Sequence, residues 1–388
     1  MNLYDEINSF FSSFDMYKTN LQDKINNEQK RLNKKKLEED TIWKNAIDEL
    51  TISSINNYLE LYPNGMYRNF ALSAINDIQA WKDVYSSSQA LEYIKYFPNG
   101  IFINDAKEYI EKTQKNEKIR ELCLWLKENN VYVVKNDNYD IKDYEIEHYK
   151  EVEKITELHF RYGRKVKLKI PHSINLLINL NIINIGFDYT VDELPPEIGD
   201  LKHLKKLSIK GDNLILPPEI GNLTDLEELE IRGCNVFPET IGNLSRLQSL
   251  NIAMSYSSEP QNPIQLPTSI GNLKNLKYLE ITHRIEVLPV SIGNLEKLEF
   301  LRVCSGCLKE FPDIRNLKRL QKLALTAARK ITSIPNWFVE LENIKSLDLS
   351  CTGITRFPPN FNFSQYHSIQ VDMANVGVVN KLRSLFGI

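Results

Sequence analysis

The stretch from Leu194 to Val303 decides the fold, because one sixteen-residue phrase occurs in it five times. The first two copies read LPPEIGDLKHLKKLSI at 194–209 and LPPEIGNLTDLEELEI at 216–231. The other three are FPETIGNLSRLQSLNI at 237–252, LPTSIGNLKNLKYLEI at 266–281 and LPVSIGNLEKLEFLRV at 288–303. Self-similarity with a period of roughly 20 to 50 residues indicates a repeat architecture, in which stacked units share one continuous core.

Each copy ends in a run of the form L-x-x-L-x-L, and the same run can be followed beyond the regular block on both sides. Alternation along a strand directs the last two apolar residues of the run into the core and the intervening residue outward. The Pro and Gly of the other half favour turns and short helical fragments over a long helix. About ten parallel strands are predicted, marked by Leu158/Phe160, Ile183/Ile185, Leu207/Ile209, Leu229/Ile231, Leu250/Ile252, Leu279/Ile281, Leu301/Val303, Leu323/Leu325, Leu347/Leu349 and Ile369/Val371.

The phrase and its period resemble the leucine-rich repeats of plant Ras-group and bacterial intracellular proteins. The resemblance implies an α/β solenoid, a horseshoe with its parallel strands on the concave face. It also implies a non-enzymatic function in which that face binds a protein partner. One feature departs from the family: its ladder asparagine is nearly absent, so backbone groups in these turns are expected to need water or other partners. The position holds Asp188, Asp212, Cys234, Ser255, Arg284, Gly306, Ala328, Thr352 and Ala374.

A second repeat precedes the array. Each copy predicts two helices, because Pro-Asn-Gly ends the first helix and a small residue, Ala71 or Ala106, lets the second pack closely. The copies resemble tetratricopeptide-type hairpins, and two are fewer than the three or so that a free-standing array needs. We therefore expect them to share burial with neighbouring segments. The matching residues are Trp43, Tyr58 and YPNG at 62–65 in the first copy, and Trp81, Tyr93 and FPNG at 97–100 in the second.

The N-terminal segment, residues 1–42, has apolar residues at helical spacing and then a basic run. Two interpretations are open. The segment is a helix that docks to a partner or a membrane surface, or its apolar face packs on the following helices and the charges are merely solvated. The apolar positions are Leu3, Ile7, Phe10, Phe11, Phe14, Leu21 and Ile25, and the basic ones are Lys30, Arg31, Lys34, Lys35 and Lys36.

These patterns divide the chain into five expected segments. Residues 131–154 are expected to form a cap or linker that covers the open end of the core. A calcium loop at 136–143 is disfavoured, because the central Gly and the closing Glu are missing. The segments are an amphipathic and charged helix at 1–42, helical repeats at 43–130, the cap at 131–154, the leucine-rich array at 155–376 and a C-terminal cap or tail at 377–388.

Composition and motifs exclude several function classes. A net charge of −3 gives no basic field for nucleic acid. Five scattered cysteines suit reduced thiols, and a basic leader or a long apolar run is lacking, so a cytoplasmic protein without a membrane partner is expected. No phosphate loop, metal-binding histidine pair or nucleophile elbow occurs, and Cys304-x-x-Cys307 stands alone. We therefore expect no catalytic residue, no cofactor and no metal site.

The outward residues of the strands are the candidates for partner binding. Tyr278 and Phe300 occupy the same column of adjacent repeats, and aromatic and Arg residues carry most interface energy. The alternative is ordinary exposure of surface aromatics. The overlong repeat at 253–265 adds a loop, either functional or a neutral insertion. The predicted partner-binding residues are Arg232, Met254, Tyr256, Tyr278, Glu280, His283, Phe300 and Arg302.

Two functional hypotheses follow from the sequence. The first is a protein–protein recognition scaffold or adaptor whose array binds one protein and whose N-terminal helices bind a second, by analogy as a subunit of a bacterial effector or defence complex. The second is a secreted bacterial effector that binds host proteins. The sequence leaves the partner and the oligomeric state open.

Overall fold

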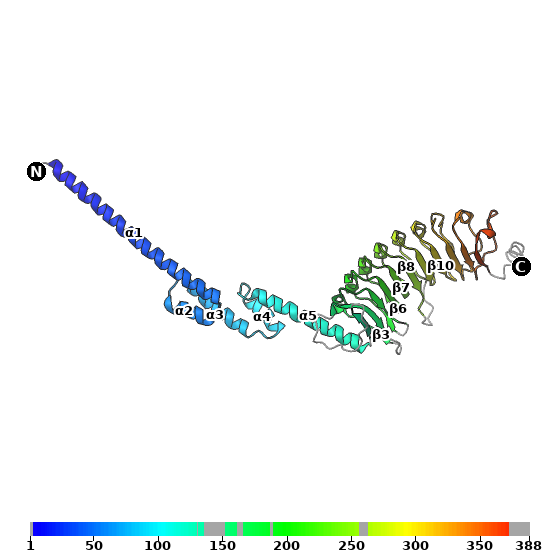
Figure 1. Cartoon of the computed structure of the whole chain (residues 1–388), viewed down its shortest axis with the longest axis horizontal. Coiled ribbons are helices and arrows are strands. Elements are labelled where there is room, and N and C mark those ends of the chain that lie inside the picture. Colours follow the sequence, from blue (N-terminus) through cyan, green and yellow to red (C-terminus); the bar gives the residue numbers. More distant parts are fainter. Residues whose placement is uncertain are drawn as a thin grey trace. The chain divides into compact units, whose positions relative to one another are not determined.

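The computed structural model describes residues 3–129, 131–135, 152–160, 166–186, 189–255 and 263–371. The chain divides into two compact units, residues 1–116 and 117–388. The first unit is helical and the second is a repeat array, as the labels of Figure 1 show. The division falls inside one helix, α5, whose Ala106 and Ile110 pack in the helical core and whose Leu122 and Leu126 pack in the core of the array.

Five helices precede the array, and among the described residues none is both long and apolar enough to cross a bilayer. Thr51 caps the second helix through a reciprocal pair with Ser54, and Ser86 accepts a hydrogen bond from the Gln89 amide at the start of the fourth. The helices are α1 (Leu3–Glu49), α2 (Ile52–Leu61), α3 (Arg68–Lys82), α4 (Ser87–Tyr96) and α5 (Ile103–Glu128).

The first predicted helical repeat is held by a hydrogen-bonded carboxylate and a pair of rings. Glu39 Oε1 accepts from the Tyr58 hydroxyl at 2.8 Å and from the Met66 amide at 2.5 Å. The Tyr58 oxygen in turn accepts from the Tyr67 amide at 3.0 Å, and the Tyr67 ring stacks on Trp43 with centroids 5.4 Å apart. The Pro-Asn-Gly turn that follows α2 is therefore held in place by a residue of α1, Glu39.

The second helical repeat has the same construction. Asp77 accepts from the Tyr93 hydroxyl and, at 2.6 Å, from the Ile101 amide. Tyr93 accepts from the Phe102 amide at 3.1 Å, and the Phe102 ring stacks on Trp81 with centroids 5.6 Å apart. The two predicted repeats are thus the same set of contacts formed twice, and the prediction of N-terminal helical repeats is confirmed.

The array is one eleven-stranded sheet, with a small second sheet beside it. All ten predicted strands are present, parallel and in the predicted register: Leu158 aligns with Ile183, and Leu301 with Leu279 and Leu323. The strands are β2 (Ile155–Phe160), β4 (Ile182–Asn184), β6 (Lys206–Ile215), β7 (Glu228–Val236), β8 (Ser249–Ala253), β9 (Tyr278–Thr282), β10 (Phe300–Cys304), β11 (Lys322–Thr326), β12 (Ser346–Leu349) and β13 (Ser368–Val371).

Two strand features extend beyond the ten predicted repeats. β1 (Val131–Lys135), in the segment expected to form the cap, pairs antiparallel with β2 and begins the sheet. β3 (Val166–Leu168) pairs with β5 (Tyr189–Val191) in the second sheet, which the sequence analysis did not predict. The calcium-like loop at 136–143 and the tail at 377–388 lie outside the described residues.

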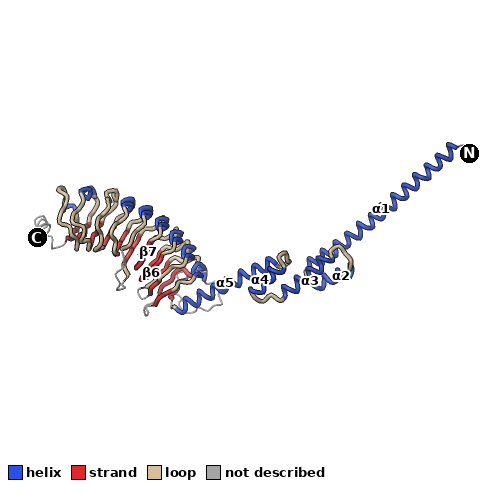
Figure 2. Tube along the Cα trace, turned by 180° about the vertical axis from the view of Figure 1, so that it is seen from behind, coloured by secondary structure: helices blue, strands red, loops and turns tan. Residues whose placement is uncertain are grey.

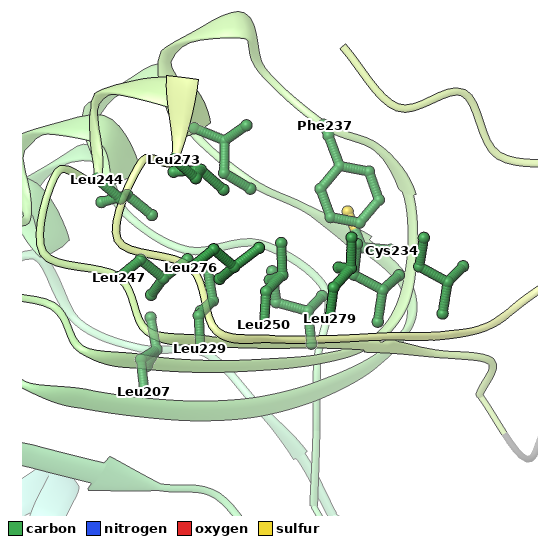
Figure 3. Close-up of a cluster of buried hydrophobic side chains, with 14 of the residues drawn as sticks. Leu207, Leu229, Cys234, Phe237, Leu244, Leu247, Leu250, Leu273, Leu276 and Leu279 are labelled. Atoms are coloured by element: carbon green, nitrogen blue, oxygen red, sulfur yellow. The ribbon is translucent and has the colours of Figure 1, made fainter. Parts of the chain in front are cut away.

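The half-repeats between strands form short 3-10 helices, as the Pro and Gly of the phrase predicted, except between β10 and β11. Figure 2 shows these helices on the side of the array opposite the strands. Apolar residues fill the space between, and Figure 3 shows Leu207, Leu229, Leu250 and Leu279 stacked from strand to strand. The helices are η1 (His172–Leu176), η2 (Pro196–Asp200), η3 (Pro218–Asn222), η4 (Glu239–Asn243), η5 (Thr268–Asn272), η6 (Val290–Asn294), η7 (Asn336–Glu340) and η8 (Phe363–Gln365).

The Ile-Gly-Asn glycines are required by close packing between repeats. A Cβ at Gly221 would lie 2.3 Å from the Thr240 carbonyl oxygen, and one at Gly242 would lie 2.4 Å from that of Ser269. Both distances are far below van der Waals contact, so only glycine lets consecutive 3-10 helices approach this closely. The repeated IGN phrase therefore sets the spacing of the array.

One turn shows what replaces a ladder asparagine. The buried Ser305 hydroxyl accepts from the Ile285 amide at 3.0 Å and donates to the Ile285 carbonyl at 2.8 Å. The Cys307 amide also donates to it at 3.3 Å. A serine next to the ladder position thus supplies the expected alternative partner for backbone groups of two successive repeats.

Candidate protein-binding surface

Side chains on the concave face stand in rows that cross the sheet, because the parallel strands keep one register. Each row takes one residue from every repeat, so residues distant in sequence become neighbours about 4.8 Å apart. The first row is Lys206, Glu228, Ser249, Tyr278, Phe300, Lys322 and Ser346, and the second is Ser208, Glu230, Asn251, Glu280, Arg302, Ala324 and Asp348.

Four predicted site residues meet at the middle of these rows. The rings of Tyr278 and Phe300 stack with centroids 4.4 Å apart and planes 1° from parallel. The Tyr278 hydroxyl donates to the Glu280 carboxylate, which also lies 3.6 Å from the Arg302 guanidinium. We call Tyr278, Glu280, Phe300 and Arg302 the aromatic cluster. Its rings are half-buried, and 42% of the Arg302 side chain is exposed, so the cluster presents both apolar and cationic surface.

The electrostatics of the aromatic cluster keep its groups in defined states. Burial, and then the hydrogen bond to Glu280, raise the pKa of Tyr278 to about 12, so the phenol stays a neutral donor. Arg302 Nε on β10 and Asn251 Oδ1 on β8, the strands on either side of β9, are buried without a hydrogen-bond partner among the described residues. Such polar atoms usually find a partner in water or a ligand, which makes this part of the face incomplete by itself.

Two further predicted residues lie beside the aromatic cluster rather than in it. Arg232, on β7, binds Glu230 Oε1 through Nη2 at 2.7 Å and through Nε at 3.0 Å. Met254 is half-buried just after β8, where its amide donates to the Thr282 carbonyl at 3.0 Å. Tyr256 and the rest of 256–262, the centre of the predicted loop, lie outside the described residues.

His283 requires a correction. The sequence placed its side chain outward, beside the aromatic pair, but only 1% of the residue is exposed. The chain turns inward after β9, and the ring is enclosed with its Nδ1 3.4 Å from the Arg284 carbonyl oxygen. Burial lowers its pKa from the ordinary value of 6.5. A partner on the concave face therefore cannot contact this ring.

One end of the face carries an ion pair and a hydrogen bond that were not predicted from the sequence. Lys206 lies 2.6 Å from Glu228 in the first row, and Ser208 donates to Glu230 at 2.9 Å in the second. The signal was opposite charge at the same position of adjacent repeats. Cys304 and Cys307 are half-buried, and no group of three or more His, Cys, Asp or Glu side chains in the described ranges could hold a metal ion.

Comparisons with known proteins agree with this architecture. A family model for a leucine-rich repeat region matches residues 164–262 and 259–385. No curated protein matches the chain. Among solved structures, the ectodomain of the Arabidopsis thaliana receptor kinase GASSHO1/SCHENGEN3, in complex with CASPARIAN STRIP INTEGRITY FACTOR 2, is 20% identical with a TM-score of 0.40. That match covers 56% of this chain and 30% of the ectodomain.

Two other solved structures are similar at the same level. The Arabidopsis receptor kinase HAESA is 23% identical over 46% of this chain and 35% of its own, with a TM-score of 0.33. A leucine-rich repeat protein of Leptospira interrogans is 22% identical over 53% of this chain and 70% of its own, with a TM-score of 0.26. The chain therefore spans about a third of the plant receptor chains that it matches. Since the family model spans more than half of the 388 residues, this protein belongs to the leucine-rich repeat family.

Proposed function

We propose that this protein is a non-enzymatic recognition scaffold that binds a protein partner on the concave face, centred on the aromatic cluster. The observation that carries the proposal is the register-aligned stack of Tyr278 on Phe300 with Arg302 beside it. Aromatic and Arg side chains that are held rigidly lose little entropy on binding and dominate interface energies. Leucine-rich repeat proteins are commonly scaffolds for protein–protein interaction, which supports the same function.

The concave face is large enough for a stable complex. Ten strands at about 4.8 Å spacing give a face about 45 Å long. A standard interface needs about 800 Å² from each partner, which this face can supply. The aromatic cluster lies near the middle of it, where well-packed interfaces place the residues that matter most.

The two flanks of the aromatic cluster differ, and this difference supports an oriented partner. On the N-terminal side the rows carry charges, including Lys206, Glu228 and Glu230. On the C-terminal side the small residues Ala324 and Ser346 stand next to the charged Lys322 and Asp348. Charged flanks select a register and an approach direction, whereas small residues permit close approach of a backbone. We infer a folded protein segment with a charged end and an apolar centre.

The helical unit supplies a second docking region under this proposal, as in an adaptor that joins two proteins. We place the protein in the cytoplasm, as a subunit of a bacterial effector or defence complex. The cysteines of the described structure form no disulfide, which is consistent with reducing conditions. Host proteins in place of same-cell proteins among the captured partners would instead identify a secreted effector.

Affinity capture from the native cell with mass spectrometry tests the concave face. The variant Tyr278→Ala/Phe300→Ala is compared with wild type and with Lys274→Ala/Glu296→Ala, which alters an exposed ion pair outside the rows of the concave face. We expect the aromatic variant to reduce retention of one partner by more than about tenfold, equivalent to about 1.4 kcal/mol, and the control to retain it. A partner list that the aromatic variant leaves unchanged, with its circular dichroism spectrum intact, would show that the aromatic cluster is not the binding site.

A further inference from the structure

The second row of the concave face has its smallest side chain at Ala324. Ala324 lies on β11, between Arg302 on β10 and Asp348 on β12. Because neighbouring strands are about 4.8 Å apart, the backbones that carry the two charged residues are about 10 Å apart, with one methyl group between them. We call the space above this methyl group the Ala324 slot. Its floor is apolar, and its two walls carry opposite charges.

The Arg302 wall of the slot offers hydrogen-bond donors. Nη1 of Arg302 lies 3.6 Å from Glu280 Oε1 on β9, which is on the side of β10 away from the slot. Nε has no hydrogen-bond partner among the described residues, and 42% of the side chain is exposed. Guanidinium nitrogens donate and never accept, so an occupant of the slot must present an acceptor to this wall.

The Asp348 wall offers an acceptor. Asp348 Oδ1 accepts from the Ser350 amide at 2.9 Å and from the Ser350 hydroxyl at 2.6 Å. These two bonds fix the orientation of the carboxylate, and no other donor in the described part of the chain is bonded to it. An ionised carboxylate only accepts, so an occupant must present a donor to Oδ2.

A buried hydroxyl at one end of the slot also lacks a partner. Thr326 follows Ala324 by two residues on β11, so strand alternation places both side chains on the concave face. Thr326 is 8% exposed, and its Oγ1 forms no hydrogen bond with any described residue. Buried hydroxyls in folded proteins nearly always have a partner. This hydroxyl, which can donate or accept, therefore points to an occupant with polar atoms.

The charges around the slot favour a neutral occupant. Arg302 and Lys322, the neighbour of Phe300 in the first row, are cationic, whereas Glu280 and Asp348 are anionic. A carboxylate of the partner would meet Asp348, and an ammonium group would meet Arg302, so like charges disfavour both. An apolar side chain would leave the donor and the acceptor unpaired and shielded from water. A neutral group with one acceptor and one donor satisfies both walls.

We propose that the Ala324 slot receives the side-chain carboxamide of an Asn or Gln residue of the bound protein. Its oxygen accepts from Arg302, its nitrogen donates to Asp348, and the Thr326 hydroxyl completes the set. The oxygen and nitrogen of an amide are about 2.3 Å apart, and two hydrogen bonds of about 2.9 Å extend this to about 8 Å, which fits between the walls. A main-chain amide has the same groups, but the chain on either side of it rests on the walls and holds it above the floor. This inference rests on the proposed function and specifies a polar residue of the partner.

The slot lies close enough to the aromatic cluster for one segment to reach both. Ala324 is one strand and two residues away from Phe300, a separation of about 8 Å. Residues i and i+2 of an extended segment point the same way and lie about 6.7 Å apart. An apolar residue on the aromatic cluster, followed two residues later by Gln, therefore occupies both sites.

Two peptides that differ only in one side-chain group test the assignment. Acetyl-Phe-Ala-Gln-N-methylamide carries the carboxamide, and acetyl-Phe-Ala-Glu-N-methylamide carries the isosteric carboxylate. Each is titrated into the full chain, and NMR follows the resonance of the ¹³C-labelled Ala324 methyl group. We expect the Gln peptide to bind about tenfold more tightly than the Glu peptide, because only the carboxamide satisfies both walls. Equal affinities, or an Ala324 resonance that neither peptide shifts, overturn the proposal.

The variant Asp348→Asn tests the second wall through a change of specificity. Its amide oxygen can keep the two bonds from Ser350, and its nitrogen turns the second wall into a donor. The preference should then reverse, so that the Glu peptide binds more tightly than the Gln peptide. The matched control, Glu228→Gln, removes one negative charge from the first row on β7 and should keep the wild-type preference. Reversal in both variants, or in neither, overturns the proposal.

The outcomes separate this inference from the proposed function. Tyr278→Ala/Phe300→Ala should weaken both peptides by about the same factor, because the phenylalanine of each peptide loses its contact. If that loss occurs and the Gln peptide has no advantage, the aromatic cluster binds and the Ala324 slot does not select. If the advantage of the Gln peptide persists and the double variant changes nothing, the slot stands and the proposed centre of the binding surface is wrong.

Discussion

The helical repeats and the leucine-rich repeats of this chain are stabilised in different ways. Each helical repeat fixes its Pro-Asn-Gly turn with a carboxylate, Glu39 or Asp77, that accepts a tyrosine hydroxyl and a backbone amide. The leucine-rich repeats fix their positions with apolar residues and, in the regular block, with glycine at the closest approach, as at Gly221. Directional hydrogen bonds stabilise the helical repeats, whereas close packing of apolar side chains and glycines stabilises the leucine-rich repeats.

This difference explains how each region relates to function. Hydrogen bonds fix the geometry of each helical repeat locally, so two copies are enough to form a stable unit. α1 can therefore continue beyond the repeats. Packing by shape uses only inward side chains and glycines, and leaves the outward rows of the array free to vary. The concave face can therefore hold the aromatic cluster without any change in the core. Four predictions, in order of decreasing effect, test whether the two regions depend on these different interactions.

Asp77→Ala should give the largest loss, because it removes the acceptor of two buried or partly buried donors. Asp77 is 4% exposed and accepts from the Tyr93 hydroxyl and the Ile101 amide. An orphaned buried donor costs about 1–3 kcal/mol, so we expect a loss of about 4 kcal/mol in the local stability of the second helical repeat. Hydrogen–deuterium exchange of peptides covering 87–110 measures it.

The first helical repeat supplies the control for Asp77. Glu39→Ala removes the equivalent acceptor, but its bond to the Met66 amide is solvent-exposed. Water can replace the carboxylate there, so the loss should be smaller than that of Asp77→Ala. Equal exchange rates in wild type and Asp77→Ala would contradict the view that polar bonds hold this region together.

Gly221→Ala tests packing by shape in the array. The added methyl group would lie 2.3 Å from the Thr240 carbonyl oxygen, a backbone atom that can move only with its whole repeat. Overpacking of this kind costs about 3 kcal/mol. Gly306→Ala is the matched control, because its nearest atom would be 3.9 Å away. Urea unfolding of both variants measures the difference, and a Gly221→Ala midpoint as high as that of Gly306→Ala would refute the packing account.

The sequence predicted the array well because its signal is periodic. Every strand from β2 to β13 on the main sheet is marked by apolar residues at a fixed offset, and a parallel register then places Tyr278 beside Phe300 without further information. The pairing of Lys206 with Glu228 carried the same kind of signal. Structural features that recur with the repeat period can therefore be predicted from a single sequence.

Features that occur once could not be predicted in this way. His283 follows β9 by a single residue, and whether its ring turns outward depends on how the chain bends into an irregular turn. The sheet formed by β3 and β5 depends on three-residue strands without periodic neighbours. The acceptors Glu39 and Asp77 contact amides 27 and 24 residues away, a pairing that becomes visible only when both copies are aligned in space.

Ser305→Ala should give a smaller loss than Gly221→Ala. It removes the hydroxyl that bonds the Ile285 amide and carbonyl inside the core, in place of a ladder asparagine. Because one buried amide loses its hydrogen-bond partner, we expect the free energy of unfolding to fall by about 2 kcal/mol. Ser350→Ala, which removes a half-buried hydroxyl bonded to Asp348, should cost less than half as much. Thermal unfolding compares them, and equal losses would show that Ser305 has no special part in the turn.

His283 gives the smallest effect, and one that depends on pH. Burial lowers the pKa of His283 from 6.5, so the folded state binds its proton less readily than the unfolded state does. The stability that the neutral His283 ring contributes to the folded state is therefore fully present above pH 6.5. It is lost as pH falls through the lower pKa of the folded state. Wild type should lose more thermal stability than His283→Gln between about pH 7.5 and about pH 5, because the variant lacks this proton-binding group. Carboxylates titrate in both proteins and cancel in the difference. Parallel melting-temperature profiles for the two proteins would place the ring in contact with solvent and return His283 to the concave surface.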